Sequence, residues 1–458
     1  MGLLSKLFFI VALLLAVLSY VLRFGATYHT PQCTLFGIQC PNKTVVEGYI
    51  HQDYAPLKEF YQAMFDQGEE LYSCLAVYEK KEKVVDLCGG NVTTANGEKQ
   101  FRNIVQNVFS STKVIVMITV AMLVDRGLLK YDEPIATYWP EYAQGNKAEV
   151  TVSDLMAHAS GVSFLDKTIP WSVIGTDSNL DELGRLLAEQ PHNFDGKRTV
   201  GYHALLYGTI ANEIVRRVDT KKRTIAEFAT QEIIEPLDVK YYFGLPEHLE
   251  KENFSYFYDH PAFNMFAKII PRVLFNIPFV PSLGPNQAYL KDALKGEPSS
   301  PVKRSFGDRI FGEGSPHLDT IFHTPEYRRL QHMTGTNGFT QATSLAKIGQ
   351  IMIDGTVDGI KFLSEETRSL AMTPLPTEFD LVLTYNMTRC VGGFGVVEVP
   401  SINATLKGWT GFGGSVMLFD SENEISFGYV PGVKGGQFIS VDDRIVSLME
   451  EFYRLNKH

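Results

Sequence analysis

The chain has 458 residues, of which 45% are hydrophobic and 12% aromatic, so it can bury one large core or two ordinary ones. Its 42 basic and 52 acidic residues give a net charge of -10, spread along the chain without long runs of one sign. This balance argues against nucleic acid as a partner, because a phosphate backbone attracts positive charge. Five cysteines are too few for a scaffold held mainly by disulfides.

An apolar segment without charges, residues 7–22, lies between Lys6 and Arg23 at the N-terminus. It is long for the core of a signal peptide and slightly short for a bilayer span. No small-x-small cleavage pattern follows closely, so we favour an uncleaved signal anchor over residues 1–23, with a cleaved signal peptide as the alternative. Both interpretations predict a main domain in the secretory lumen or outside the cell, either on a single-pass membrane protein or secreted.

N-glycosylation signals agree with this compartment. The acceptor pattern Asn-x-Ser/Thr begins at Asn42, Asn91, Asn253, Asn386 and Asn403.

The cysteine positions also suit an oxidising compartment. Cys74 and Cys88 flank LAVYEKKEKVVDL, which predicts a hairpin that turns near Lys80 and Lys81 and can hold a cross-strand disulfide. Cys33 and Cys40 can close a small loop after the membrane segment. Cys390 is then left as a buried or free thiol.

The chain divides into a short stalk, residues 24–46, and a globular domain, residues 47–458. Within the domain, STKVIVMITVAMLVDR at 111–126 is apolar on nearly every face and is followed by Gly127, which predicts a buried central helix with a glycine stop. Residues 254–283 are aromatic and interrupted by prolines, which suits a lid over a pocket, a membrane-surface contact or additional core.

Strands are predicted early and late in the chain, and helices between them. Residues 151–236 follow helical patterns, whereas GGFGVVEV, GGSVMLFD and EISFGYV near the C-terminus are typical of strands, and VDDRIVSLMEEFYRL predicts a closing helix. We therefore expect an α/β lobe, about 47–105 and 345–458, assembled from both chain ends around a helical lobe, about 106–344.

A serine and a lysine one helical turn apart are candidates for a nucleophile and its base, because positions i and i+3 are neighbours on a helix. Three pairs have this spacing, and their serines are Ser110, Ser300 and Ser344. Context favours Ser110, because it lies at the start of the apolar helix, where amide N–H groups favour negative charge. Lys113 lies inside that helix, where burial lowers the pKa of the amine. The other pairs, with Lys303 and Lys347, lie in a loop-like segment and at a helix start whose lysine can point outward.

The segment FSSTKVIVMITVAMLVDRGLLKYDEPIATYWPEY followed by TVSDLMAHASGV resembles the nucleophile region of class C β-lactamases, family VIII esterases and penicillin-binding-type peptidases. GYHALLYGTIANEIVRRV, FTQATSLAKIGQIM and KGWTGFGGSVMLFD resemble later motifs in the same order. The resemblance covers about residues 47–458, and the N-terminal apolar segment makes the whole most similar to animal β-lactamase-domain proteins. It implies an α/β (α+β) fold in which helices flank an antiparallel sheet and a mostly helical lobe is inserted.

The resemblance also implies roles for individual residues. Ser110 would be the acylated nucleophile, Lys113 its proton acceptor or electrostatic partner, and Tyr202 a second base stabilised by the nearby ammonium. The backbone N–H groups of Ser110 and Phe412 would form the oxyanion hole.

Two departures from the family pattern narrow the substrate. The second motif is usually Tyr-x-Asn, but here Ala204 replaces the asparagine, at a position that the resemblance implies binds substrate. The third motif usually starts with lysine or histidine before Thr-Gly, but here it consists of Trp409, Thr410 and Gly411, which resembles the esterase branch. An indole in place of a cation favours apolar contact over binding of a carboxylate, so we expect a neutral acyl group rather than a penicillin.

These observations predict a serine hydrolase that cleaves a neutral ester or amide of a small molecule, peptide or lipid without a cofactor. The alternative is an inactive relative that uses the old pocket, or the aromatic segment, for binding or membrane organisation. A transpeptidase is disfavoured by the lost cation. No His-Glu-x-x-His or similarly spaced cluster predicts a metal site. The sequence does not indicate an oligomeric state.

Overall fold

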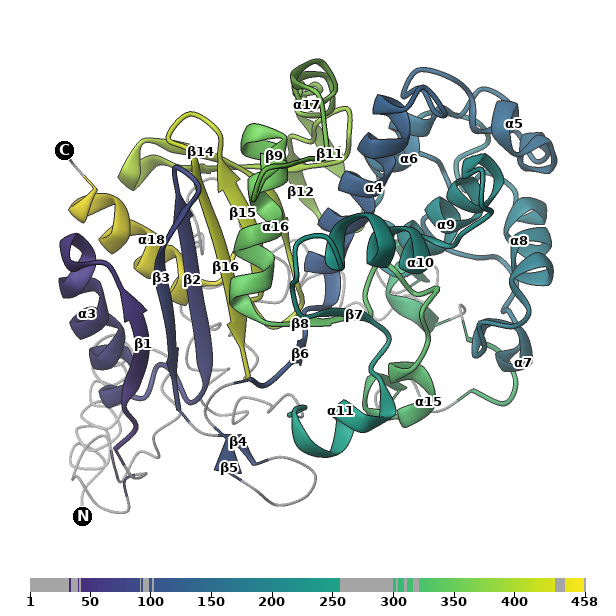
Figure 1. Cartoon of the computed structure of the whole chain (residues 1–458). Helices are drawn as coiled ribbons and strands as arrows, with labels where there is room; N and C mark the ends of the chain where they lie inside the picture. Colours follow the sequence, from purple (N-terminus) through teal and green to yellow (C-terminus); the bar gives the residue numbers. More distant parts are fainter. Residues whose placement is uncertain are drawn as a thin grey trace, which may run out of the picture.

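The computed structural model describes residues 33, 40, 43–90, 92–93, 99–100, 103–255, 300–301, 304–308, 311–315, 321–432 and 441–456 (Figure 1). The predicted membrane segment, most of the stalk, Asn42, Asn91, Lys303 and all of the aromatic segment after residue 255 lie outside these residues. Within the described ranges, no helix combines the length and apolar composition that a bilayer span requires.

A seven-stranded antiparallel sheet forms one half of the molecule (Figure 1). In spatial order its strands are β1 (Val46–Ile50), β3 (Glu82–Gly89), β2 (Ser73–Glu79), β16 (Ile425–Pro431), β15 (Val416–Asp420), β14 (Ala404–Thr410) and β13 (Gly395–Val399). The two ends of the chain meet where β2 pairs with β16, with Tyr429 opposite Leu75. The prediction of an antiparallel sheet flanked by helices is confirmed.

Helices cover both faces of this sheet. α3 (Ala55–Asp66) and α18 (Asp443–Leu455) contact each other on one face, and α16 (Ala342–Asp354) lies against β2, β15 and β16 on the other. Because both faces are covered, β15 and β16 are buried along their whole length, as their nearly continuous apolar sequences require.

The second half of the molecule is mostly helical (Figure 1). Its helices are α4 (Lys113–Asp125), α5 (Ile135–Tyr138), α6 (Val152–Met156), α7 (Trp171–Ile174), α8 (Leu180–Glu189), α9 (Leu206–Val218), α10 (Ile225–Ala229), α11 (Glu247–Glu252) and α15 (Pro325–Arg328). α4 contacts α9, α10, α17 and β14, so it lies between the two halves. This central helix begins two residues later than predicted, because Phe109–Thr112 forms a 3-10 turn ahead of it.

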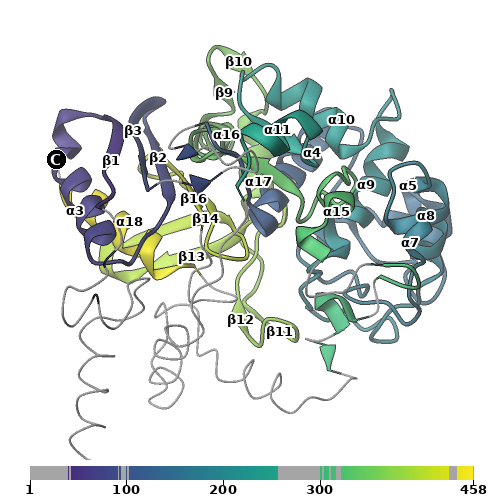
Figure 2. The same ribbon diagram turned by 90° about the horizontal axis from the view of Figure 1, so that it is seen from below.

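Short strands and one further helix complete the fold. A three-stranded sheet joins β6 (Gln106–Asn107), β8 (Gly338–Thr340) and β7 (Tyr241–Phe243). Apart from short 3-10 and π-helical turns, the remaining described elements are β4 (Val92–Thr93), β5 (Lys99–Gln100), β9 (Thr356–Val357), β10 (Ile360–Lys361), α17 (Glu365–Ala371), β11 (Glu378–Asp380) and β12 (Tyr385–Met387). The last two strands form a hairpin beside β13 and β14 (Figure 2).

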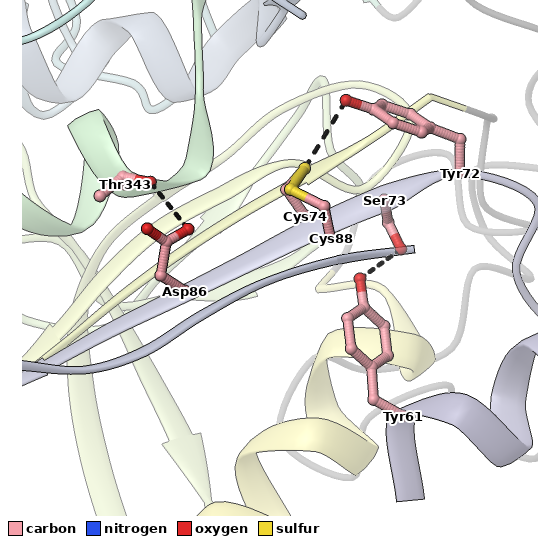
Figure 3. Close-up of a disulfide and its surroundings, with 7 residues drawn as sticks. All are labelled: Tyr61, Tyr72, Ser73, Cys74, Asp86, Cys88 and Thr343. Carbon is pink, nitrogen blue, oxygen red and sulfur yellow. Dashed lines mark hydrogen bonds between the residues drawn. A yellow bond between two sulfur atoms is a disulfide. The ribbon is translucent and has the colours of Figure 1, made fainter. Parts of the chain in front are cut away.

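The β2–β3 hairpin contains a disulfide between Cys74 and Cys88, which are directly opposite each other in the strand register (Figure 3). Lys80 and Lys81 form its turn with φ values of 47° and 72°, as a two-residue hairpin loop requires. A second disulfide joins Cys33 and Cys40. Cys390 is a buried free thiol whose pKa is raised to about 11 by burial, so it is a weak nucleophile.

The contact between α16 and β16 depends on two glycines. A methyl group on Gly428 would lie 2.1 Å from Ala342 O and 2.7 Å from Ala346 N, which are backbone atoms of α16. A methyl group on Gly349 would lie 2.2 Å from Ser426 Oγ, a hydroxyl without a hydrogen-bond partner in the described chain, and otherwise no closer than 3.4 Å to any atom outside its own helix.

We therefore expect Gly428→Ala to destabilise the fold by about 3 kcal/mol, because the helix backbone cannot rotate away as a side chain can. Gly349→Ala is the matched control: the Ser426 hydroxyl can rotate, and alanine is favoured over glycine within a helix. Thermal and urea unfolding of the two variants should separate them clearly. Equal destabilisation would contradict this account of the interface.

Candidate active site

Ser110 lies on a sharp turn between β6 and α4. Phe109, just before it, has φ of 43°, an unusual conformation for a bulky residue, and its N–H donates to Asn107 Oδ1 at 2.8 Å. The 3-10 turn that follows leaves Ser110 partly exposed while Ser111 and Thr112 are buried. The local backbone thus presents one hydroxyl at the mouth of α4.

The turn is fixed against the end of β14. Ser111 Oγ donates to Ser415 O at 3.0 Å, and Ser415 Oγ donates to Val108 O at 2.8 Å. A methyl group on Gly411 would lie 2.1 Å from Val108 O, so only glycine permits this close approach. The segment that follows β14 is therefore held beside Ser110.

Lys113 is fully buried at the start of α4, one helical turn from Ser110. Its Nζ lies 2.8 Å from Gly335 O, 2.9 Å from Ala204 O and 3.2 Å from Ser110 Oγ. Within the described chain no carboxylate forms an ion pair with it, and burial holds the pKa of the amine well below its usual value. A neutral amine can donate its two hydrogens to the carbonyl oxygens and keep its lone pair for Ser110.

Tyr202 completes the group from a distant part of the chain. Its hydroxyl donates to Ser110 Oγ at 2.6 Å, and Lys113 Nζ lies 5.0 Å from the centre of its ring. Burial raises the pKa of Tyr202 to about 12, an effect that the contacts with Ser110 and Trp409 reduce. The phenol is thus protonated at neutral pH, and the structure brings together the three residues that the sequence singled out.

A cavity opens at Ser110 and contains about 640 Å³ of space, including its open mouth. Its walls are formed by Ser110, Tyr202, Phe306, Leu383, Tyr385, Met387, Gly395, Val397, Gly408, Trp409, Thr410, Gly411, Phe412 and Val441. None of these residues is charged, and most are apolar. Trp409 forms part of the wall and stacks on the Tyr202 ring, with centroids 5.7 Å apart and planes 20° apart.

Two motif residues are absent from the described walls of this cavity. Ala204 was expected to bind substrate, but it is 4% exposed and does not line the cavity, and its carbonyl oxygen accepts from Lys113 Nζ. His203 is buried, with its ring nitrogens 2.7 Å from Ser160 Oγ and from Gly201 O. The missing amide of the Tyr-x-Asn pattern is therefore not replaced by the neighbouring histidine.

The competing Ser-x-x-Lys pair that is fully described does not form a similar site. Ser344 Oγ accepts the N–H of Lys240 at 3.1 Å, while Lys347 Nζ binds Leu237 O and the carboxylate of Asp358. Ser300 is buried, and its lysine lies outside the described residues. Among the described residues there is also no group of three His, Cys, Asp or Glu side chains that could hold a metal ion.

Sequence reasoning missed much of the cavity wall. Leu383, Tyr385 and Met387 come from the β11–β12 hairpin and its loop, Phe306 from the helical turn Arg304–Asp308, and Val441 from the segment before α18. The first three alternate along the chain as strand residues do, but only the fold brings the three segments together. The carbonyl of Gly335, which holds Lys113, carries no side-chain signal at all.

Comparisons with known proteins agree with this geometry. The β-lactamase family model matches residues 63–444. An esterase/β-lactamase of Mycobacterium tuberculosis, LipL, is 29% identical over 392 residues, which are 84% of this chain and 82% of that protein.

Solved structures are also similar. A penicillin-binding protein homologue from Caulobacter crescentus has a TM-score of 0.72 at 27% identity, and a family VIII carboxylesterase has a TM-score of 0.71 at 22% identity. Each similarity covers 90% of this chain and 99% of the other, and the second shows the fold alone. The resemblance noted from the sequence is confirmed: the chain belongs to the β-lactamase family and is a serine hydrolase of the esterase and β-lactamase type.

Proposed function

We propose that the protein hydrolyses a neutral ester or amide through an acyl-enzyme on Ser110. The observation that carries the proposal is the contact of one hydroxyl with both a buried amine and a protonated phenol, at 3.2 and 2.6 Å. Nucleophilic catalysis needs a hydroxyl within hydrogen-bond reach of a base.

In the first half of the reaction, neutral Lys113 takes the proton of Ser110 while Oγ attacks the substrate carbonyl carbon. Tyr202 gives its proton to the leaving alcohol or amine as the old bond breaks. The site then holds an ammonium and a phenolate, and the ammonium stabilises the phenolate because the two charges are close in a buried region.

In the second half, the Tyr202 phenolate takes a proton from water, and the resulting hydroxide attacks the acyl carbon. Ser110 leaves as the alkoxide and recovers its proton from Lys113. Each cycle therefore consumes one ester or amide and one water and returns all three side chains to their starting states. The N–H groups of Ser110 and Phe412 would stabilise the oxyanion in both halves.

The cavity supports a substrate with an uncharged acyl group. Its described walls carry no charged side chain, and Trp409 occupies the position where relatives with Lys-Thr-Gly or His-Thr-Gly have a cation. A carboxylate placed here would lose its water without gaining a partner. The same walls disfavour β-lactams, which carry such a carboxylate.

We also propose that the domain faces the secretory lumen or the cell exterior, on a membrane anchor or in secreted form. The two disulfides support this, because disulfides persist in oxidising compartments. Asn386 and Asn403 are exposed and Asn253 is partly exposed, so all three acceptor sites can be reached by a glycosyltransferase.

The first test concerns the nucleophile. A fluorophosphonate should add to Ser110 of the wild-type protein and not to Ser110→Ala, and intact-mass measurement would show the added group. Wild type should hydrolyse short neutral aryl esters faster than matched esters with a carboxylate on the acyl group, and should leave β-lactams intact. Equal labelling of the two proteins would exclude Ser110. Ser344→Ala, which removes the serine of the competing Ser-x-x-Lys pair, is the control for a general effect of removing a hydroxyl.

The second test uses the pH dependence of kcat/KM for a neutral aryl ester. Acylation needs the neutral amine form of Lys113. The value of kcat/KM should therefore rise with pH through the lowered pKa of this amine and then level off. It should fall only where Tyr202 loses its proton, with a pKa of about 12. A rate that kept rising to that point would instead make the Tyr202 phenolate the base. Lys113→Arg should be inactive, because a guanidinium does not give up its proton.

The third test concerns the compartment. Expressed in animal cells, the full chain should lose apparent mass on treatment with an N-glycosidase, and Asn386→Gln and Asn403→Gln should each remove part of that shift. A chain whose mobility is unchanged by the enzyme would contradict the lumenal orientation.

A further inference from the structure

The main-chain amide of Tyr202 is held by a side chain from the β11–β12 hairpin, which also contributes residues to the cavity wall. Asp380, at the end of β11, is fully buried, and its Oδ1 accepts the N–H of Tyr202 at 3.0 Å. On the other side of the same residue, Ser305 Oγ donates to Tyr202 O. The backbone that carries the catalytic phenol is therefore fixed from both sides.

The same carboxylate oxygen shapes the wall of the cavity. Asp380 Oδ1 also accepts the N–H groups of Val382 at 2.8 Å and Leu383 at 2.9 Å, and Leu383 lines the cavity. A backbone bond from Leu381 N to Val200 O, at 3.1 Å, ties this loop again to the segment before Tyr202. One oxygen thus joins the loop between β11 and β12 to the catalytic tyrosine.

The second oxygen of Asp380 neutralises a buried cation. Oδ2 pairs with Arg389, which is 3% exposed, and the Arg389 guanidinium carbon lies 5.7 Å from the centre of the Trp409 ring. Trp409 in turn stacks on Tyr202. The carboxylate therefore acts on Tyr202 directly through its amide and indirectly through the stacked indole.

We propose that Asp380 is a positioning residue that couples the acyl-pocket wall to the catalytic tyrosine, so that the β11–β12 hairpin sets both what the pocket accepts and where the phenol lies. The inference rests on the proposed role of Tyr202. A hydroxyl 2.6 Å from Ser110 works only within a narrow range of positions, and rotation of the Tyr202 peptide would move it out of reach.

The test compares two double variants that both remove the buried ion pair. Asp380→Asn with Arg389→Met keeps the side-chain oxygen for the three N–H groups, whereas Asp380→Ala with Arg389→Met removes it. Because neither leaves an unpaired buried charge, both are expected to fold, and thermal unfolding would check this. Each double variant is also combined with Tyr202→Phe, and kcat and KM of all the variants are measured on a neutral aryl ester.

The alanine double variant should lose on the order of 10- to 100-fold in kcat relative to the asparagine one, with KM changed by no more than about a factor of two. This gap should disappear with Tyr202→Phe, because a residue that acts through the phenol has nothing to position once the hydroxyl is gone. A gap that persisted with Tyr202→Phe, or no gap at all, would overturn the inference.

Failure of the underlying mechanism would look different. If Tyr202→Phe alone kept the wild-type kcat, the proposed role of Tyr202 would fail together with this inference. If Ser110→Ala stayed active, the nucleophile assignment would fail on its own.

Discussion

The chemistry that we propose depends on a lysine amine that is buried with no carboxylate beside it among the described residues. Lys113 is fully enclosed, and two backbone carbonyl oxygens replace the water that it would otherwise bind. Taking an ammonium out of water disfavours the charged form, so the amine is available as a base. A carboxylate at the same place would restore the charge and remove the basicity. The surrounding fold encloses the Lys113 amine and supplies uncharged hydrogen-bond acceptors, the backbone carbonyl oxygens.

The antiparallel sheet explains how distant segments meet at that amine. β2 comes from the start of the domain and β16 from its end. The two strands pair within the sheet, and α16 packs against both of them. Two strands further on, β14 ends at Thr410, where Gly411 allows the chain to touch the turn that carries Ser110. Strand register therefore places Ser110 beside the end of β14, and side-chain changes on the surface leave that register unaltered.

The sequence was sufficient for the parts of the site that lie in local patterns. Ser110 and Lys113 could be found because they lie three residues apart where an apolar helix begins, and Tyr202 because its motif resembles a known one. The Cys74–Cys88 hairpin followed from its turn and spacing. Gly335 and Asp380 could not be found, because they act through a main-chain oxygen and through a contact across 178 residues. Ala204 was expected to bind substrate, and the sequence did not indicate that its carbonyl oxygen would instead bind Lys113.

The described walls of the cavity at Ser110 carry no charged side chain. Trp409, the first residue of the third motif, forms part of these walls, and the Arg389 guanidinium carbon lies 5.7 Å from the centre of its ring. The positive charge of Arg389 is neutralised by its ion pair with Asp380. Two buried charges thus hold backbone and ring in place, while the described walls of the cavity are apolar or neutral and polar. The neutral-substrate function that we propose therefore depends on the support of the Trp409 indole by Arg389 as well as on the absence of a cation from the third motif.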